Sequence, residues 1–258
     1  MLNFKSVNVT TSVIFIGLLV IFLIKPISIW WFILLILSWL ILTALGSGLV
    51  GWNYHIKSLN ANKNAPENHI AITFDDGPNP DFTPQVLALL NKFQAKATFF
   101  CIGKQIENHP ELFKKILDEG HTIGNHTYTH NNNFGFFKTE KVQGELEKTN
   151  SIIREISGLN SKLYRPAFGV TNPRIRRAVQ NLNLTSIGWN KRSLDTTHLS
   201  EKAIFKRVTK NLKSGDVILL HDTNEKSVRV LEQLLLFLRE TNFQSVTVDS
   251  LFNITAYA

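Results

Sequence analysis

The chain opens with two long apolar segments, at about residues 7–24 and 27–45, with Lys25 and Pro26 between them. The second is long enough to cross a bilayer, whereas polar residues crowd the start of the first. A cleaved signal peptide fits less well than a helical hairpin or a single span with an amphiphilic lead-in. A second apolar segment follows directly, and no small-residue cleavage site separates the two. We therefore expect residues 1–52 to form a membrane anchor of one or two transmembrane helices, with tryptophans near the interfaces.

Beyond the anchor, the polar and proline-containing stretch at 53–66 predicts a linker, and residues 67–258 alternate between strand and helix patterns. Expected strands are 70–74, 97–102, 121–125, 163–165, 185–189, 217–221 and 245–248. One expected helix starts near Pro84, with Thr83 as its cap. The other expected helices cover 110–119, 139–157, 173–183, 201–212 and 226–240. This alternation predicts an α/β domain with a mostly parallel sheet. About seven strands in one continuous domain favour an irregular (β/α) barrel over an open sheet.

Composition changes this picture little. The net charge of +8 and the pI near 9.6 suit anionic head groups or an acidic wall polymer, and equally a plain lysine-rich surface. Without an arginine-rich run or basic residues interleaved with aromatics, we expect no nucleic-acid partner. The single cysteine, Cys101, excludes an intramolecular disulfide. It lies in an apolar run, which favours a small buried side chain over a nucleophile. Nothing in the sequence indicates an oligomeric state.

Polar residues follow the expected strands, and in parallel barrels such strand ends form the active-site rim. These residues are Asp75, Asp76, His126, Arg165, Trp189 and His221.

Adjacent carboxylates such as Asp75 and Asp76 repel each other, and a cation relieves the repulsion. A surface turn at Asp-Asp-Gly-Pro is the alternative. His126 and His130 are spaced to share one side of a helical turn and reach one ion. With one aspartate they supply three ligands, which leaves positions open for water and substrate, as in a catalytic metal site.

Four ordered motifs resemble those of the polysaccharide deacetylases, the carbohydrate esterase family 4 that shares the NodB homology domain. They are Thr73–Pro78, His126–His130, Tyr164–Gly169 and Leu219–His221, and the resemblance covers residues 66–251.

The resemblance implies a role for each matching residue. Asp75 would be the general base that activates water, His221 the acid that protonates the leaving amine, and Arg165 the partner of Asp75. Asp76, His126 and His130 would bind one divalent cation, expected to be zinc. The backbone at Phe168 would stabilise the oxyanion, and Trp189 would line the substrate site.

Two departures from the family pattern stand out. Ala167 replaces the usual proline of the third motif, and Arg192 stands three residues after Trp189, where the family often has an aspartate. We expect Asp195 either to orient His221 in its place or to hold Arg192.

We therefore expect a hydrolase that removes N-acetyl groups from amino sugars of peptidoglycan, a chitin-like oligomer or an exopolysaccharide. Alternatives are a deacylase or deformylase of a lipid-linked sugar, and a membrane-tethered glycan-binding module without catalysis. Lys5, Lys57 and Lys63 outnumber Lys25, which weakly favours a cytoplasmic domain for a hairpin. The anchor together with the resemblance favours an extracytoplasmic one.

Overall fold

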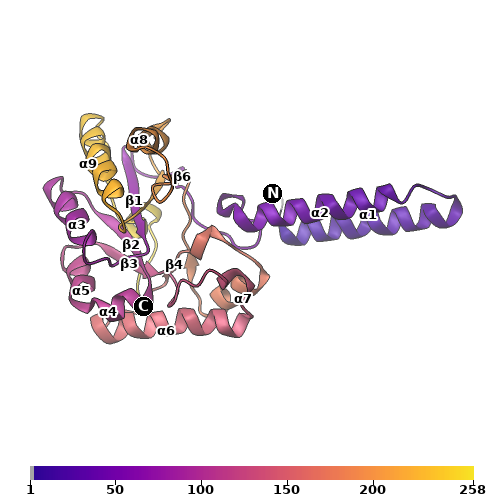
Figure 1. Cartoon of the computed structure of the whole chain (residues 1–258), viewed down its shortest axis with the longest axis horizontal. Coiled ribbons are helices and arrows are strands. Elements are labelled where there is room, and N and C mark those ends of the chain that lie inside the picture. Colours follow the sequence, from indigo (N-terminus) through magenta and orange to yellow (C-terminus); the bar gives the residue numbers. More distant parts are fainter. Residues whose placement is uncertain (1–2) are drawn as a thin grey trace.

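The computed structural model describes residues 3–258, and two helices at its start form an apolar hairpin. Helices α1 (Phe4–Ile24) and α2 (Trp30–Gly48) lie side by side and project away from the rest of the protein (Figure 1). The indole of Trp39 donates to Asn8 Oδ1 at 2.7 Å, which satisfies one of the polar side chains near the start of α1. Both helices are long and apolar enough to cross a membrane, and only 6% and 11% of their apolar windows are buried. They are therefore unlike the core helices of a globular domain.

A half-barrel of seven parallel strands forms the remainder of the chain, which confirms the predicted fold class. Its strand order is β5-β4-β3-β2-β1-β7-β6, and β8 pairs with the start of β1. The strands are β1 (His69–Asp75), β2 (Ala97–Cys101), β3 (Thr122–Asn125), β4 (Leu163–Tyr164), β5 (Thr185–Ser186), β6 (Lys191–Arg192), β7 (Val217–His221) and β8 (Gln244–Ser245).

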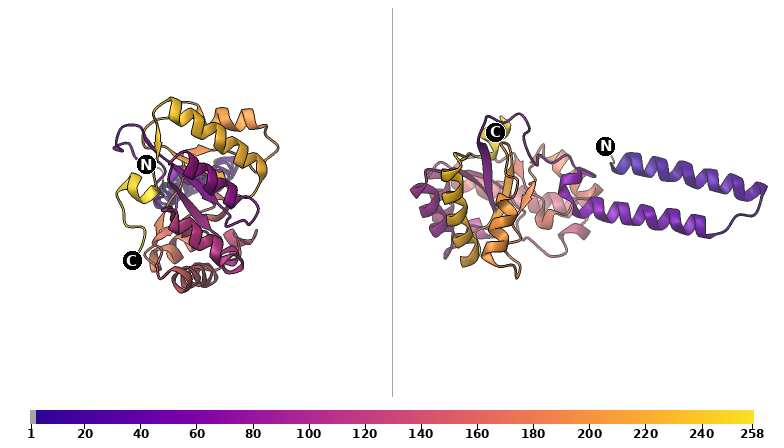
Figure 2. Two further views of the ribbon diagram at one scale, coloured as in Figure 1. Left: turned by 90° about the vertical axis from the view of Figure 1, so that its left-hand side faces the viewer. Right: turned by 90° about the horizontal axis from the view of Figure 1, so that it is seen from above.

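Helices cover the outside of this sheet (Figures 1 and 2). They are α3 (Thr83–Lys92), α4 (Gly103–Asn108), α5 (Pro110–Asp118), α6 (Thr139–Ser157), α7 (Pro173–Asn181), α8 (Glu201–Thr209) and α9 (Glu225–Glu240). The short α10 (Val248–Phe252) packs on the opposite face, where Val248 and Leu251 cluster with Ala71 and Leu219. Short 3-10 turns occupy Val50–Trp52, Phe134–Phe136 and Ala167–Gly169. The main core lies between the sheet and the helices, where Phe74 of β1 stacks on Phe99 of β2. Cys101 is fully buried at the end of β2, as predicted.

Two expected strands end three residues earlier than predicted, and those expected at 97–102 and 163–165 end one residue earlier. The strand expected at 185–189 stops at Ser186, because the carbonyls of Ile187 and Gly188 turn inward to accept from the Arg165 guanidinium. The strand expected at 245–248 stops at Ser245, and α10 starts at Val248. Thr83 does not cap its helix as expected, since its hydroxyl donates to Asp222 and accepts from the Asn79 amide.

The segment at 53–66 connects the hairpin to β1, and it packs along the domain. Leu59 and Ala61 form single β-bridges with Ile187 and Asp216. The hairpin itself is bonded to this segment and to the domain. The Phe4 amide donates to the Tyr54 carbonyl at 3.0 Å, and the Thr171 amide donates to the Ser47 carbonyl at 2.9 Å.

Candidate active site at the carboxyl ends of the strands

The carboxyl ends of the central strands bring the predicted polar residues together. Asp75 ends β1 and is in register with His221, the last residue of β7. Asn125 ends β3, and His126 follows it. Since all neighbouring strands are parallel, these ends meet at one rim, as the pattern of the sequence predicted.

Asp76, His126 and His130 form one compact cluster. The Nε2 atoms of His126 and His130 lie 3.3 and 3.4 Å from Asp76 Oδ1. The ligating atoms of the three side chains all lie within 4.8 Å of one another. Asp76 points to this cluster because its backbone is left-handed, with φ of 79°. Such a conformation is uncommon outside glycine, although aspartate adopts it more readily than most residues, and residues held in it cluster at functional sites.

The two histidines converge through a loop and not through the helical turn that their spacing suggested. Thr127 and His130 both have left-handed backbones, with φ of 67° and 47°. Glu145 of α6 holds this loop, because its carboxylate accepts from the amides of Tyr128 and Thr129 at 3.1 and 2.7 Å. The loop is therefore held in an unfavourable conformation by bonds to a neighbouring helix.

The cluster fits a divalent cation. His126 Nδ1 lies 3.0 Å from the carbonyl of Arg165, which can only accept, so Nδ1 carries the proton and the Nε2 lone pair faces Asp76. In the part of the chain that the structure describes, Asp76 Oδ1 is buried without a hydrogen-bond partner. Two imidazole nitrogens and a carboxylate oxygen directed at one point are donors typical of zinc.

The electrostatics of the cluster agree with this fit. Burial lowers the pKa of His130 to about 4, helped by the nearby His126. Burial opposes the charge of Asp76, but the facing histidines outweigh it and hold the pKa of that carboxyl well below its usual range. Burial also opposes a charge on His126, but Asp75 and Asp76 outweigh it and raise the pKa of that ring. The two carboxylates thus favour a positive charge here, which a proton on His126 or a cation between the three side chains can supply.

Arg165 is fully buried beneath Asp75. Its Nη1 lies 3.2 Å from Asp75 Oδ1 and 2.8 Å from the Thr73 hydroxyl, and its other nitrogens bond the carbonyls of residues 187 and 188. The guanidinium also lies over the Phe100 ring, 4.2 Å from its centroid. Arg165 therefore places a positive charge directly beside the buried carboxylate of Asp75.

His221 is oriented by Asp195, one of the two possibilities that the altered fourth motif left open. Asp195 Oδ1 lies 2.8 Å from His221 Nδ1, and Oδ2 accepts from the His221 amide at 2.8 Å. The hydroxyls of Ser193 and Ser227 also donate to this fully buried carboxylate. Burial disfavours a charge on His221, but Asp195, Asp75 and Asp76 outweigh it and raise the pKa of the ring to about 9.

Arg192 does not pair with Asp195. It lies at the rim, exposed, with its guanidinium 5.9 Å from the centroid of the Trp189 ring. A pocket of about 250 Å³ lies between Arg192, Trp189, Phe168 and the clustered histidines and carboxylates. Trp189 lies in the loop before β6 and not at a strand end.

Phe168 borders the same pocket from a strained turn. Its backbone is left-handed, with φ of 57°. Its ring is half-exposed, and the centroid of the ring lies 4.3 Å from the centroid of the His130 ring. Gly169, with φ of 70°, lies so close to Trp189 that a Cβ there would come within 3.0 Å of the indole. The turn thus lies at the mouth of the pocket, and Ala167 stands in it where the family usually has proline.

Three supporting residues were missed by the sequence analysis. Glu145 and Ser227 lie on helices far along the chain from the groups they hold, so no local pattern identified them. Asp222 directly follows His221, and its fully buried carboxylate accepts from Thr83. Burial raises the pKa of Asp222 to about 7. A Cβ at Gly77 would overlap this carboxylate, so the glycine lets the turn after Asp76 pack against Asp222.

The chain is similar to known deacetylases. Residues 62–187 match the polysaccharide deacetylase family. A peptidoglycan-N-acetylglucosamine deacetylase of Bacillus cereus is 36% identical over 193 residues, which are 72% of this chain and 88% of that protein. A peptidoglycan-N-acetylmuramic acid deacetylase of Bacillus subtilis, PdaC, is 33% identical over 182 residues, which are 70% of this chain and 38% of that protein.

A solved structure is similar over nearly its whole length. The crystal structure of the Bc1960 peptidoglycan N-acetylglucosamine deacetylase superposes with a TM-score of 0.72 at 31% identity, covering 78% of this chain and 94% of that one. These similarities, together with the four motifs, show that the chain belongs to the polysaccharide deacetylase family.

Proposed function

We propose that this protein is a zinc-dependent N-deacetylase that acts on the amino sugars of peptidoglycan. The observation that carries the proposal is that three groups converge on one pocket. They are the three side chains that can bind a cation, the carboxylate of Asp75 paired with Arg165, and His221 paired with Asp195. The relatives' activity on peptidoglycan favours that polymer over chitin-like oligomers and exopolysaccharides.

The chemistry divides among the chain's own residues. Asp76, His126 and His130 would hold the cation, which when bound lowers the pKa of water and polarises the acetyl carbonyl. Asp75, which pairs with Arg165, takes a proton from the water that attacks the carbonyl carbon. The amide at the Phe168 turn faces the developing oxyanion. Protonated His221 then gives its proton to the sugar nitrogen as the carbon–nitrogen bond breaks, which releases acetate and a free amine.

Trp189 and Asp195 complete the site in this proposal. Trp189 forms an apolar wall on which a sugar ring can pack, beside the Phe168 turn. Asp195 fixes the tautomer of His221, since its bond to Nδ1 leaves Nε2 to face the pocket.

We further propose that the hairpin of α1 and α2 is a membrane anchor and that the domain lies outside the cytoplasm, next to the wall. The apolar surface of the hairpin is almost entirely uncovered in the described structure, which suits lipid contact. Peptidoglycan as substrate requires the domain on that side of the membrane.

The test is acetate release by the full chain in detergent micelles. Peptidoglycan, N-acetylglucosamine oligomers and a lipid-linked amino sugar are compared, with zinc or with a chelator. Asp75→Asn is expected to lower the rate about 10²–10⁴-fold, the usual contribution of a general base. Asp81→Asn, at an exposed aspartate six residues further on, is the matched control and is expected to retain full activity.

Each other outcome points to a different function. Release that survives chelation or Asp75→Asn would contradict the mechanism. Release from the lipid-linked sugar alone would favour the membrane deacylase. Zinc binding without hydrolysis of any substrate would favour a glycan-binding module.

A further inference from the structure

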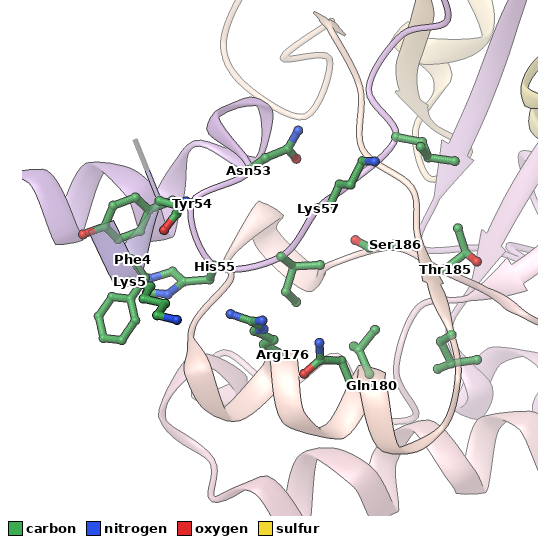
Figure 3. Close-up of a pocket in the computed structure, with 15 residues that line it drawn as sticks. Phe4, Lys5, Asn53, Tyr54, His55, Lys57, Arg176, Gln180, Thr185 and Ser186 are labelled. Carbon is green, nitrogen blue, oxygen red and sulfur yellow. The ribbon is translucent and has the colours of Figure 1, made fainter. Parts of the chain in front are cut away.

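A cavity of about 610 Å³, larger than the active-site pocket, lies where the hairpin meets the domain. Its walls come from the start of α1, from the segment after α2 and from α7 with the following strand β5. Figure 3 shows side chains from these separate parts of the chain around one hollow. The active-site residues do not line it, so the cavity needs its own explanation.

The cavity is positively charged. Lys5 from α1, Lys57 from the connecting segment and Arg176 from α7 all line it, and all three are exposed (Figure 3). No aspartate or glutamate is among the described residues that line it. Within residues 3–258 none of the three cations forms an ion pair. Three cations from distant parts of the sequence therefore share one cavity without a counter-charge, which favours an anionic ligand.

A buried histidine adds a free polar group. His55 lines the same cavity and is 4% exposed. Its Nε2 lies 3.0 Å from the Ser47 hydroxyl, and in the described structure its Nδ1 has no hydrogen-bond partner. Burial, together with the nearby Arg176, lowers the pKa of His55 to about 4, so the ring is neutral. When Ser47 donates to Nε2, Nδ1 carries the single ring proton and is a donor without an acceptor.

The position of the cavity indicates the source of the anion. Both ends of the hairpin meet the domain here, since α1 starts at Phe4, whose amide bonds Tyr54, and α2 ends at Gly48. If the hairpin crosses the bilayer, this level corresponds to the head groups. Trp52, which directly precedes the lining residue Asn53, is 40% exposed, and tryptophan is enriched at membrane interfaces.

We propose that this cavity binds the phosphate of an anionic phospholipid head group, such as that of phosphatidylglycerol. The inference rests on the hairpin being a membrane anchor, which is part of the proposed function, but not on deacetylation. Lysine and arginine side chains at the membrane surface attract anionic lipid, and the cavity is large enough for a glycerophosphate group. A lipid held between α1 and α7 would fix the tilt of the domain on its anchor.

Native mass spectrometry of the full chain in neutral detergent tests the proposal. Phosphatidylglycerol, phosphatidylcholine and inorganic phosphate are titrated separately, and the bound fraction is measured. We expect phosphatidylglycerol to bind preferentially and Lys57→Ala/Arg176→Ala to weaken it at least tenfold. Lys63→Ala/Arg177→Ala removes the same charge from the same two parts of the chain but outside the cavity, and it is expected to change binding less than twofold.

The proposal is overturned by any of three results. The first is equal loss of binding in the two double variants, which would indicate general surface charge. The second is equal binding of phosphatidylcholine. The third is inorganic phosphate that binds as tightly as the lipid and depends on the same residues, which would indicate a site for a soluble anion. Acetate release in detergent is expected to be unchanged by Lys57→Ala/Arg176→Ala, so lipid binding and deacetylation can fail independently.

Discussion

Replacing Asp195 with asparagine removes a charge from beside His221 while leaving the packing almost unchanged. Asp195 is fully buried, and four groups donate to its carboxylate: the imidazole and the amide of His221 and the hydroxyls of Ser193 and Ser227. Asparagine has the same shape and retains one carbonyl oxygen. The main change is therefore the loss of the charged bond of 2.8 Å to His221 Nδ1.

The size of the effect follows from that bond. A hydrogen bond to a charged group contributes about 1.5–3 kcal/mol, which corresponds to about one to two pKa units. Burial opposes the charge on His221, and Asp195 is the main group that raises its pKa to about 9. We expect Asp195→Asn to lower the pKa of His221 by about one to two units. Because His221 must be protonated to act as the acid, activity is lost first on the alkaline side.

Stability should follow the same pair. The pKa of His221 is raised in the folded state. Its contribution to the free energy of unfolding is therefore fully present below the ordinary pKa of 6.5 and is lost as pH rises through about 9. The pKa of Asp195 is lowered, so its contribution is present above the ordinary value of 3.8 and is lost as pH falls. Asp195→Asn should therefore destabilise the protein most between about pH 3.8 and 6.5, where both contributions are fully present.

The assay is the pH profile of kcat/KM for acetate release, measured with wild type and Asp195→Asn at saturating zinc. Asp216→Asn is the control, because Asp216 is also buried but bonds Asn190 and the Lys213 amide, away from His221. We expect the alkaline limb to move to lower pH in Asp195→Asn alone. An alkaline limb that stays in place, or that moves equally in both variants, would refute the assigned role of Asp195.

Three further predictions concern the cation, the buried arginine and the rim. His130→Ala should weaken zinc binding more than about 100-fold, since even groups that only support a ligand contribute 10–100-fold; competition with a chromophoric chelator measures this. Arg165→Met should destabilise the fold by about 3–5 kcal/mol in urea titrations, because it strands the buried charge of Asp75. Arg192→Glu should raise KM for anionic wall glycan more than for neutral oligomers, because the exposed Arg192 lies beside Trp189 at the rim; equal KM changes would count against this role.

The rim was predictable because its residues directly follow apolar runs that predict strands. Asp75 and His221 each end an apolar run, and in a parallel sheet such ends must meet. The strands near Trp189 were less predictable. There the backbone carbonyls bond Arg165, a residue more than twenty positions away, and not a neighbouring strand.

The loop between the histidines shows why the detail of the cluster was not predictable. The spacing of His126 and His130 suits a helical turn, yet Thr127 has a left-handed backbone that β-branched residues rarely adopt. The loop is held by Glu145, whose position in a helical pattern is that of an ordinary surface residue. Tertiary bonds from α6 therefore decide the local conformation, and they leave no signal within the motif itself.

The packing of the hairpin against the domain bears on the active site. The Thr171 amide, three residues after Phe168, donates to the Ser47 carbonyl in the last turn of α2, and Thr171 is 2% exposed. The segment that follows the strained Phe168 turn is thus bonded to the hairpin, and the turn itself packs through Gly169 against Trp189. Ser47 also bonds His55 in the basic cavity through its hydroxyl. The last turn of α2 therefore contacts both the segment that follows the Phe168 turn and His55 of the proposed lipid site, so the hairpin packs against the parts of the chain that lead to both sites.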